Sequence, residues 1–335
     1  MTAVRLLRSV AAIASLLLFC AASAGAQNCR TSDEIDTVVR SALIAAAQHD
    51  FDLVAQGDVA SLRQNAIASA AADFGSIETS VKDSQAALAG VQNKPRPPFL
   101  LEAEGTAPLE RAEFYCGVFG KSGQTRDSAV FLLNNLPPGK YGVVVLDTAS
   151  AKGAYAVSFI LQQQGSDWKL GGLYIKPTQT AGHDSDWFVA RAREFKAKGQ
   201  VHNAWLYYLQ ARSLATALPF MSTAVTDRLY DEANGTEPAD VPADGKKADL
   251  AAGTVNYKLN AMFPQGVGND LDLVVKYDAS DISNTNQAYQ TNIAVIKALI
   301  AKHPELKDAF AGLVARAVDP SGRDFGTLLV MKDLK

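Results

Sequence analysis

Apolar residues recur along this chain with two periods, one typical of helices and one typical of strands, and the changes of period divide it into parts. The first part, residues 31–177, opens with a helical apolar stripe that runs from Ile35 to Ala46. Thr31 and Glu34 have capping-box spacing, which predicts that this helix begins at Thr31. A weaker, Ala-rich helical stretch covers about residues 59–92 and ends at the prolines that begin with Pro95.

Five strands are predicted after these prolines, because aromatic and β-branched runs are separated by Gly, Pro, Asn and Ser. They cover residues 114–119, 128–133, 141–146, 155–161 and 168–175. The fourth alternates cleanly, with Tyr155, Val157 and Phe159 on one face. Helices followed by a long antiparallel meander predict a sheet that curves over a helix.

The last of these strands contains the run GSDWKLGGLY, residues 165–174. This run, with the element order, resembles the last strand of small bacterial domains of the cystatin-like cone fold, which are similar in shape to ketosteroid isomerases and nuclear transport factor. The resemblance covers residues 31–177 and implies a cone-shaped α+β domain. Enzymes of that group use a carboxylate or histidine inside the cone. No such residue is matched here, because the strand interiors are apolar and Asp147 falls at a strand end.

The second part, residues 183–234, is predicted to be helical, with a break at Gly199. Within residues 183–218 the spacing of the small and aromatic positions resembles a single tetratricopeptide-type helical hairpin; these positions are Phe188, Ala192, Phe195, Ala204 and Tyr208. Such units stabilise one another by stacking, and about three are normally needed. A lone hairpin that packs on its neighbours is therefore favoured over a peptide-binding solenoid.

A polar, Pro- and Gly-containing stretch, residues 235–253, is the predicted domain linker. The last part, residues 254–335, shows two alternating strands, a helical stripe that ends before Pro304, and two more strands. This order predicts a small antiparallel ββαββ domain with its helix on one face. The whole chain is thus predicted to be α+β, with N-terminal helices and a curved meander, a central helical hairpin and a small C-terminal domain.

The N-terminal residues 1–26 have the order of a secretory signal peptide. Arg5 and Arg8 precede an apolar run from Val10 to Ala22, and Ala24-Gly25-Ala26 provides a small-x-small cleavage site. The run is too short for a membrane span. We therefore expect a periplasmic or secreted protein, without a transmembrane span after cleavage.

The net charge limits the classes of binding partner, and the number of cysteines indicates whether a disulfide forms. The net charge of −3 and the absence of a basic block exclude an electrostatic nucleic-acid footprint and disfavour anionic membranes. Cys20 lies inside the predicted signal, whereas Cys29 and Cys116 remain. In an oxidising compartment such a pair favours a disulfide, with a reactive thiol as the alternative.

Motifs that carry chemistry are scarce, and no cofactor is predicted. The four histidines are scattered and none has a partner at metal-ligand spacing, while phosphate loops and nucleophile elbows are absent. The densest polar cluster contains His183, Asp184 and Asp186, which are catalytic candidates or simply helix-capping residues. Asp278 and Asp281 lie in a loop rich in side-chain oxygens. Such a loop binds a calcium ion or initiates the helix that follows it.

Aromatic residues of the helical hairpin are the candidates for a binding surface. Trp187, Trp205 and Tyr207 are of the types enriched at binding hot spots, and Tyr207 falls off the predicted buried stripe. The favoured hypothesis is a non-catalytic exported protein that binds an envelope protein or a small apolar ligand. The alternatives are an enzyme with its site in the cone of the first domain, and a calcium-stabilised structural protein.

Overall fold

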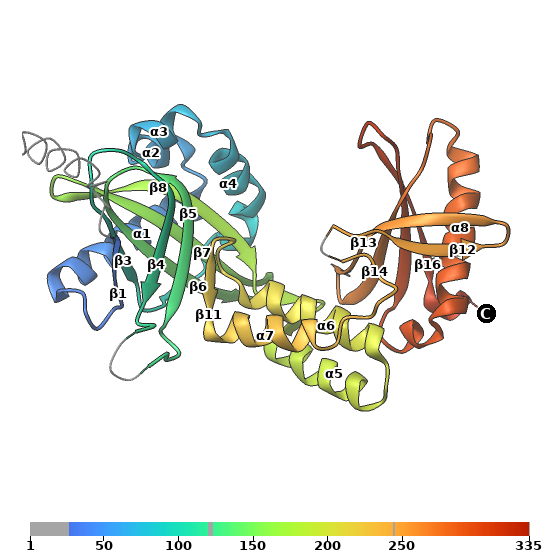
Figure 1. The fold of residues 1–335 in the computed structure, drawn as a ribbon. Helices are drawn as coiled ribbons and strands as arrows, with labels where there is room; N and C mark the ends of the chain where they lie inside the picture. Colours follow the sequence, from blue (N-terminus) through green and yellow to red (C-terminus); the bar gives the residue numbers. More distant parts are fainter. Residues whose placement is uncertain (1–26, 120–122, 244, 335) are drawn as a thin grey trace, which may run out of the picture.

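The computed structural model describes residues 27–119, 123–243 and 245–334. The predicted signal peptide, residues 1–26, lies outside these residues. The chain has an α+β architecture, in which an N-terminal unit and a C-terminal unit are joined by helices (Figure 1). No helix within the described residues is both long and apolar enough to span a membrane.

The main sheet of the N-terminal unit is antiparallel and has the order β1-β3-β6-β7-β8, with the short β2 paired to β6. Its strands are β1 (Gln27–Arg30), β2 (Asn93–Pro95), β3 (Phe99–Ala103), β6 (Gly139–Ser150), β7 (Gly153–Gln164) and β8 (Asp167–Pro177). Four helices pack on one face of this sheet, and they are α1 (Thr37–Gln56), α2 (Val59–Gln64), α3 (Ala68–Ala72) and α4 (Gly75–Leu88). Gly142 lets α1 approach closely, because a Cβ there would lie 2.0 Å from Leu43 Cδ2.

A second, small sheet covers the other face of the main sheet. The predicted antiparallel meander is confirmed for β6, β7 and β8, whereas the strands predicted at 114–119 and 128–133 belong to the small sheet. It has the order β11-β5-β4 and comprises β4 (Leu109–Cys116), β5 (Ala129–Leu136) and β11 (Met221–Thr223). Phe99 of the main sheet packs edge-on against Phe131 of the small sheet, with ring centroids 5.2 Å apart. The two sheets thus enclose a core of their own, which no single curved sheet would require.

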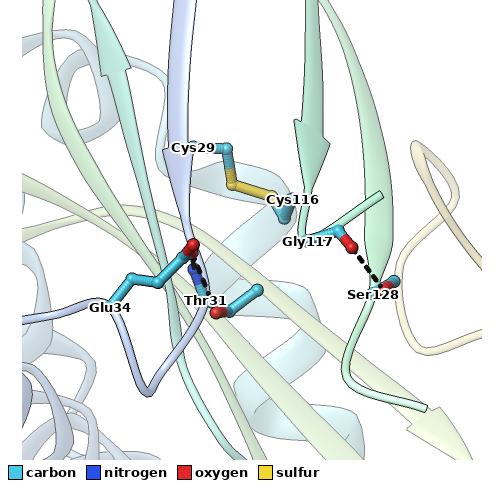
Figure 2. The surroundings of a disulfide bond; sticks show 6 residues. All are labelled: Cys29, Thr31, Glu34, Cys116, Gly117 and Ser128. Atoms are coloured by element: carbon cyan, nitrogen blue, oxygen red, sulfur yellow. Dashed lines mark hydrogen bonds between the residues drawn. A yellow bond between two sulfur atoms is a disulfide. The ribbon is translucent and has the colours of Figure 1, made fainter. Parts of the chain in front are cut away.

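The N-terminal helices also differ from the predicted ones. Thr31 donates to Glu34 Oε2 through its backbone N–H (2.8 Å) and its hydroxyl (2.9 Å), but this occurs in a turn (Figure 2). Helix α1 begins only at Thr37, where Asp36 caps it by accepting from the Val38 N–H. The predicted helix over residues 59–92 is three helices, because the backbone after α2 bonds to Leu170 of β8 instead of continuing the helix.

The central helices are α5 (Ser185–Ala197), α6 (Val201–Ala215) and α7 (Ala224–Asn234), preceded by the two-residue strands β9 (Gln179–Thr180) and β10 (His183–Asp184). The antiparallel contact of α5 with α6 confirms the predicted hairpin. All the positions with tetratricopeptide-like spacing are at most 2% exposed: Phe188, Ala192, Phe195, Ala204 and Tyr208. The tetratricopeptide and cone-fold resemblances themselves stay predictions.

The C-terminal sheet has five strands in the order β12-β13-β14-β15-β16. Its elements are β12 (Ala248–Ala252), β13 (Val255–Val267), β14 (Asp270–Asp278), α8 (Thr285–Lys302), the 3₁₀ turn η1 (Pro304–Asp308), β15 (Gly312–Val318), β16 (Asp324–Val330) and the 3₁₀ turn η2 (Met331–Asp333). The prediction of a purely antiparallel sheet is wrong, because the crossover through α8 makes β14 and β15 parallel. The predicted linker also contains β12, which pairs with β13.

A disulfide joins Cys29 of β1 to Cys116 at the end of β4, with Cα atoms 5.0 Å apart, as predicted (Figure 2). It connects the main sheet to the small sheet. Gly117 follows with a left-handed φ of 63°, and Ser128 closes this end of the hairpin by donating to the Gly117 carbonyl oxygen (3.0 Å). Such a bond is typical of proteins that fold in an oxidising, extracytoplasmic compartment.

Loss of this bond should destabilise the N-terminal unit. The loop that it closes spans 87 residues, so the double variant Cys29→Ala/Cys116→Ala should lose about 2–4 kcal/mol of unfolding free energy. Chemical denaturation monitored by circular dichroism measures this difference. Addition of a reductant to the wild type should reproduce it, and an unchanged denaturation midpoint in both experiments would contradict the structural role.

One carboxyl group is buried in the helix–sheet core. Asp50 of α1 is fully buried, and Asn65 Nδ2 donates to its Oδ1 at 2.6 Å. Its Oδ2 has no hydrogen-bond partner among the described residues. Burial, only partly offset by the Asn65 hydrogen bond, raises the pKa of Asp50 to about 6. The ionised form is therefore unfavourable in the folded state.

Replacement of this carboxylate by its neutral isostere should stabilise the fold near neutral pH. The pKa in the folded state lies above the unfolded value, so the contribution of Asp50 is fully favourable below the unfolded pKa of 3.8 and is lost as the pH rises through about 6. Asp50→Asn should raise the unfolding free energy at pH 7 by about 1–3 kcal/mol. Denaturation at pH 4 and pH 7 tests this, since the gain should vanish at the lower pH.

Candidate functional site

The predicted polar cluster lies where α5 begins, and its members line two different cavities. Asp184 is the N-cap of α5 and accepts from the Trp187 N–H at 3.0 Å. Asp184 and Asp186 line a polar cavity of about 480 Å³ between the N-terminal unit and the helices. His183 instead stacks on the Trp187 ring at 3.7 Å, and both line a separate hollow of about 220 Å³. The imidazole and the two carboxylates therefore share no cavity.

Two of the charged residues that line the polar cavity are paired with each other. Arg96 makes a bidentate contact with Asp147, with Nε and Nη2 2.8 and 2.7 Å from the two carboxylate oxygens. Asp147 lies within β6 and not at its end, and its side chain is on the rim of this cavity. The buried Asp50 lines none of the four cavities described here. Arg126 and Asp186 line the same cavity and form no ion pair within the part of the chain that the structure describes.

The calcium candidates are engaged in local contacts. Asp278 accepts from Lys247 Nζ at 2.5 Å and from Asn260 Nδ2 at 2.8 Å, and these two hydrogen bonds lower its pKa. Asp281 accepts from the backbone N–H and the hydroxyl of Ser283. Both line a polar hollow of about 390 Å³ beside α8. Asp278 is thus engaged in an ion pair with Lys247, and Asp281 stabilises the turn that precedes α8.

The aromatic candidates of the hairpin lie at its contact with the C-terminal unit. Trp205 and Tyr207 are each 4% exposed, and Trp187 is partly buried. The prediction that Tyr207 falls off the buried stripe is wrong, because α6 is covered both by α5 and by the C-terminal unit. Tyr207 contacts Phe310 with ring centroids 5.9 Å apart and donates through Oη to the Ala309 carbonyl oxygen at 2.7 Å. Tyr207 thus fastens α6 to the C-terminal unit.

An aromatic cavity of about 290 Å³ lies between α6, α7, the segment that follows α7, and β13. The aromatic and apolar residues of its wall are Trp205, Leu209, Tyr230, Pro242, Met262 and Phe263. Trp205 and Met262 are buried, whereas Tyr230 and Phe263 are 45% and 36% exposed. We call this space the aromatic cavity. It has the apolar lining and the few polar groups that small-molecule sites share.

One cation lies in the wall of the aromatic cavity. The Arg212 guanidinium lies over the Tyr230 ring, with Cζ 4.9 Å from the ring centroid. Arg212 Nε is buried and has no hydrogen-bond partner among the described residues. Glu237 also lines the cavity, on the segment that follows α7. The wall is therefore mainly apolar, with a guanidinium held in place by an aromatic face.

Sequence reasoning found only Trp205 of this cavity. Tyr230 belongs to α7, for which no apolar stripe was identified in the sequence. Phe263 lies in β13, two residues beyond Ala261, where the predicted alternation of apolar and polar residues ends. The continued alternation from Ala261 to Phe263 was the available signal. Arg212 carries no local signal, because its role depends on the packing of α6 against α7.

Comparisons with protein-family models, with curated proteins and with solved structures each find no match.

The Tyr207 hydroxyl provides a direct test of the contact between α6 and the C-terminal unit. Burial raises the pKa of Tyr207 to about 12, so the hydroxyl remains a donor at all ordinary pH values. Tyr207→Phe should leave the Ala309 carbonyl oxygen unpaired and reduce the unfolding free energy by about 1–2 kcal/mol. Tyr289→Phe on α8, a residue 42% exposed, is the matched control and should have no effect. Equal destabilisation by both variants would contradict this assignment.

Proposed function

We propose that this protein is an exported binding protein that holds a small apolar ligand in the aromatic cavity. The observation that carries the proposal is the pair of half-exposed aromatic side chains, Tyr230 and Phe263, above the buried Trp205 and Met262. The disulfide and the signal-like residues 1–26 support an extracytoplasmic location.

Removal of aromatic surface from water is the driving force for such binding. Tyr230 and Phe263 keep a large part of their surface in contact with solvent, and both line the aromatic cavity. Apolar burial contributes about 25 cal/mol per Å², so a ligand that covers both rings gains several kcal/mol before its loss of motion is counted. The volume of about 290 Å³ favours a ligand of one or two rings or a short alkyl chain.

The Arg212 guanidinium adds polarity at one side of this cavity. A guanidinium recognises carboxylates and similar anions through its planar donors, and Arg212 Nε is buried without a hydrogen-bond partner among the described residues. We therefore infer that the ligand carries an acidic group beside its apolar part, as a short fatty acid or an aromatic acid does. A purely hydrocarbon ligand would leave this cation without a partner.

Fluorescence titration tests the aromatic cavity directly. Anilinonaphthalene sulfonate, an aromatic anion, should bind the wild type with a one-site curve, and octanoate should displace it. Tyr230→Ala and Phe263→Ala should each weaken binding about tenfold or more, since loss of an aromatic wall removes more than about 1.4 kcal/mol. Tyr289→Ala is the control, because Tyr289 and Tyr230 are similarly exposed (42% and 45%) but Tyr289 lies on α8.

A further variant separates apolar burial from charge recognition. Arg212→Met preserves the stem of the side chain, so it should weaken the binding of octanoate and leave that of octanol nearly unchanged. Equal affinity of the Tyr230→Ala and Tyr289→Ala variants for the probe would refute the aromatic cavity as the binding site.

A further inference from the structure

Two histidines that are far apart in the sequence meet between α6 and the end of α8. His202 lies in the first turn of α6, and His303 is the residue that ends α8. Their rings lie 3.9 Å apart between centroids, and the residues are only 9% and 5% exposed. No local spacing along the sequence marks this pair, because the chain brings the two histidines together only through tertiary packing.

A carboxylate from the segment after α7 faces the same side of both rings. Asp240 Oδ1 lies 2.9 Å from His202 Nε2, and Asp240 Oδ2 lies 3.5 Å from His303 Nε2. One donor atom from each of these three residues lies within 4.8 Å of the other two. The side chain of Asp240 is 40% exposed, so the group is open to solvent on its side.

A second carboxylate lies on the Nδ1 side of the rings and orients His202 through a hydrogen bond. Glu305 Oε1 is 2.9 Å from His202 Nδ1 and 3.9 Å from His303 Nδ1. The backbone of Glu305 is held in turn, because the buried Asn203 donates through Nδ2 to its carbonyl oxygen at 2.6 Å. A carboxylate on Nδ1 keeps a proton on that nitrogen, so Nε2, the nitrogen that faces Asp240, is the one that would exchange its proton for a metal ion, as in the carboxylate–histidine–zinc arrangement.

We propose that His202, His303 and Asp240 bind a divalent transition-metal ion of the zinc class, with Glu305 as the orienting residue. Two imidazoles and a carboxylate match the ligand preference of Zn²⁺, and three protein ligands leave the fourth tetrahedral position open to water. The site lies at a junction of three segments, α6, the stretch after α7 and the end of α8, so the ion would cross-link them. The proposal is independent of the ligand of the aromatic cavity.

The Lys302 ammonium lies beside the Asp240 carboxylate of this cluster. Lys302 Nζ lies 2.9 Å from Asp240 Oδ2. Lys302 is exposed and can swing away when a metal ion takes its place.

Metal analysis of the chain that begins at Gln27 tests the proposal with ZnCl₂ as the probe. After incubation and dialysis the wild type should retain one Zn²⁺ per chain, and His303→Ala and Asp240→Asn should weaken zinc binding at least tenfold. His183→Ala is the matched control, because this half-buried histidine stacks on Trp187 outside the cluster, and it should bind as the wild type does. Failure of the wild type to retain zinc, or equal binding by His183→Ala and His303→Ala, would overturn the proposal.

Two further variants distinguish a metal site from a plain network of ion pairs. Glu305→Gln should preserve the stoichiometry and weaken zinc binding about tenfold or more, because it removes only the orienting carboxylate. Lys302→Met should tighten zinc binding, since the ammonium competes for Asp240. Weaker binding in Lys302→Met would instead identify the cluster as an ion-pair network. These are surface-accessible changes, and circular dichroism of each variant verifies that the fold is retained.

Discussion

The C-terminal half of the molecule depends on the burial of α6 on nearly all sides. Seven consecutive residues of this helix, His202 to Tyr208, are buried, and so are Ala211 and Leu214. A helix covered on one face alone would alternate between buried and exposed positions. Helix α6 therefore fills the space between α5, α7 and the C-terminal sheet and belongs to one continuous core with them (Figure 1).

This shared core explains why the candidate sites lie along one helix. The end of α6 near η1 carries His202, whereas its middle and later turns carry Trp205 and Arg212 of the aromatic cavity. Both sites also use the segment after α7, which crosses from the helices to β12. A rigid, buried helix is a good support for such side chains, because packing fixes their rotamers. Any motion of the C-terminal unit relative to α6 would change both sites together.

Local patterns predicted much of the fold. The α5–α6 hairpin followed from the spacing of small and aromatic residues, and the alternation in β7, β13 and β14 placed these strands correctly. The pairing of strands was not predictable in the same way. Leu109–Cys116 and Met221–Thr223 join one small sheet through β5. Met221 pairs with Phe131 of β5, about 90 residues earlier, a contact that no local period encodes. The parallel pair β14–β15 likewise depends on where α8 packs.

The candidate sites were less predictable than the fold. His202 lies 38 residues from Asp240 and 103 from Glu305, so the cluster exists only once α6, η1 and the stretch after α7 have packed. Tyr207 was assigned to a surface because a helical wheel assumes one buried face, whereas α6 has partners around it. The residue types indicated which chemistry was possible in each case. The three-dimensional neighbours of a side chain decide whether it caps a helix, fills a core or faces a ligand.

The disulfide has a consequence for the order of events during maturation. From Gln27 to Lys335 the sequence contains two cysteines, so oxidation of this stretch has a single intramolecular product and leaves no wrong pairing for an isomerase to correct. When a chain is delivered from its N-terminus, Cys116 emerges before β6, β7 and β8. The covalent link can thus form before the sheet that it braces is complete. The yield of folded protein would then depend on the speed of oxidation and not on disulfide proofreading.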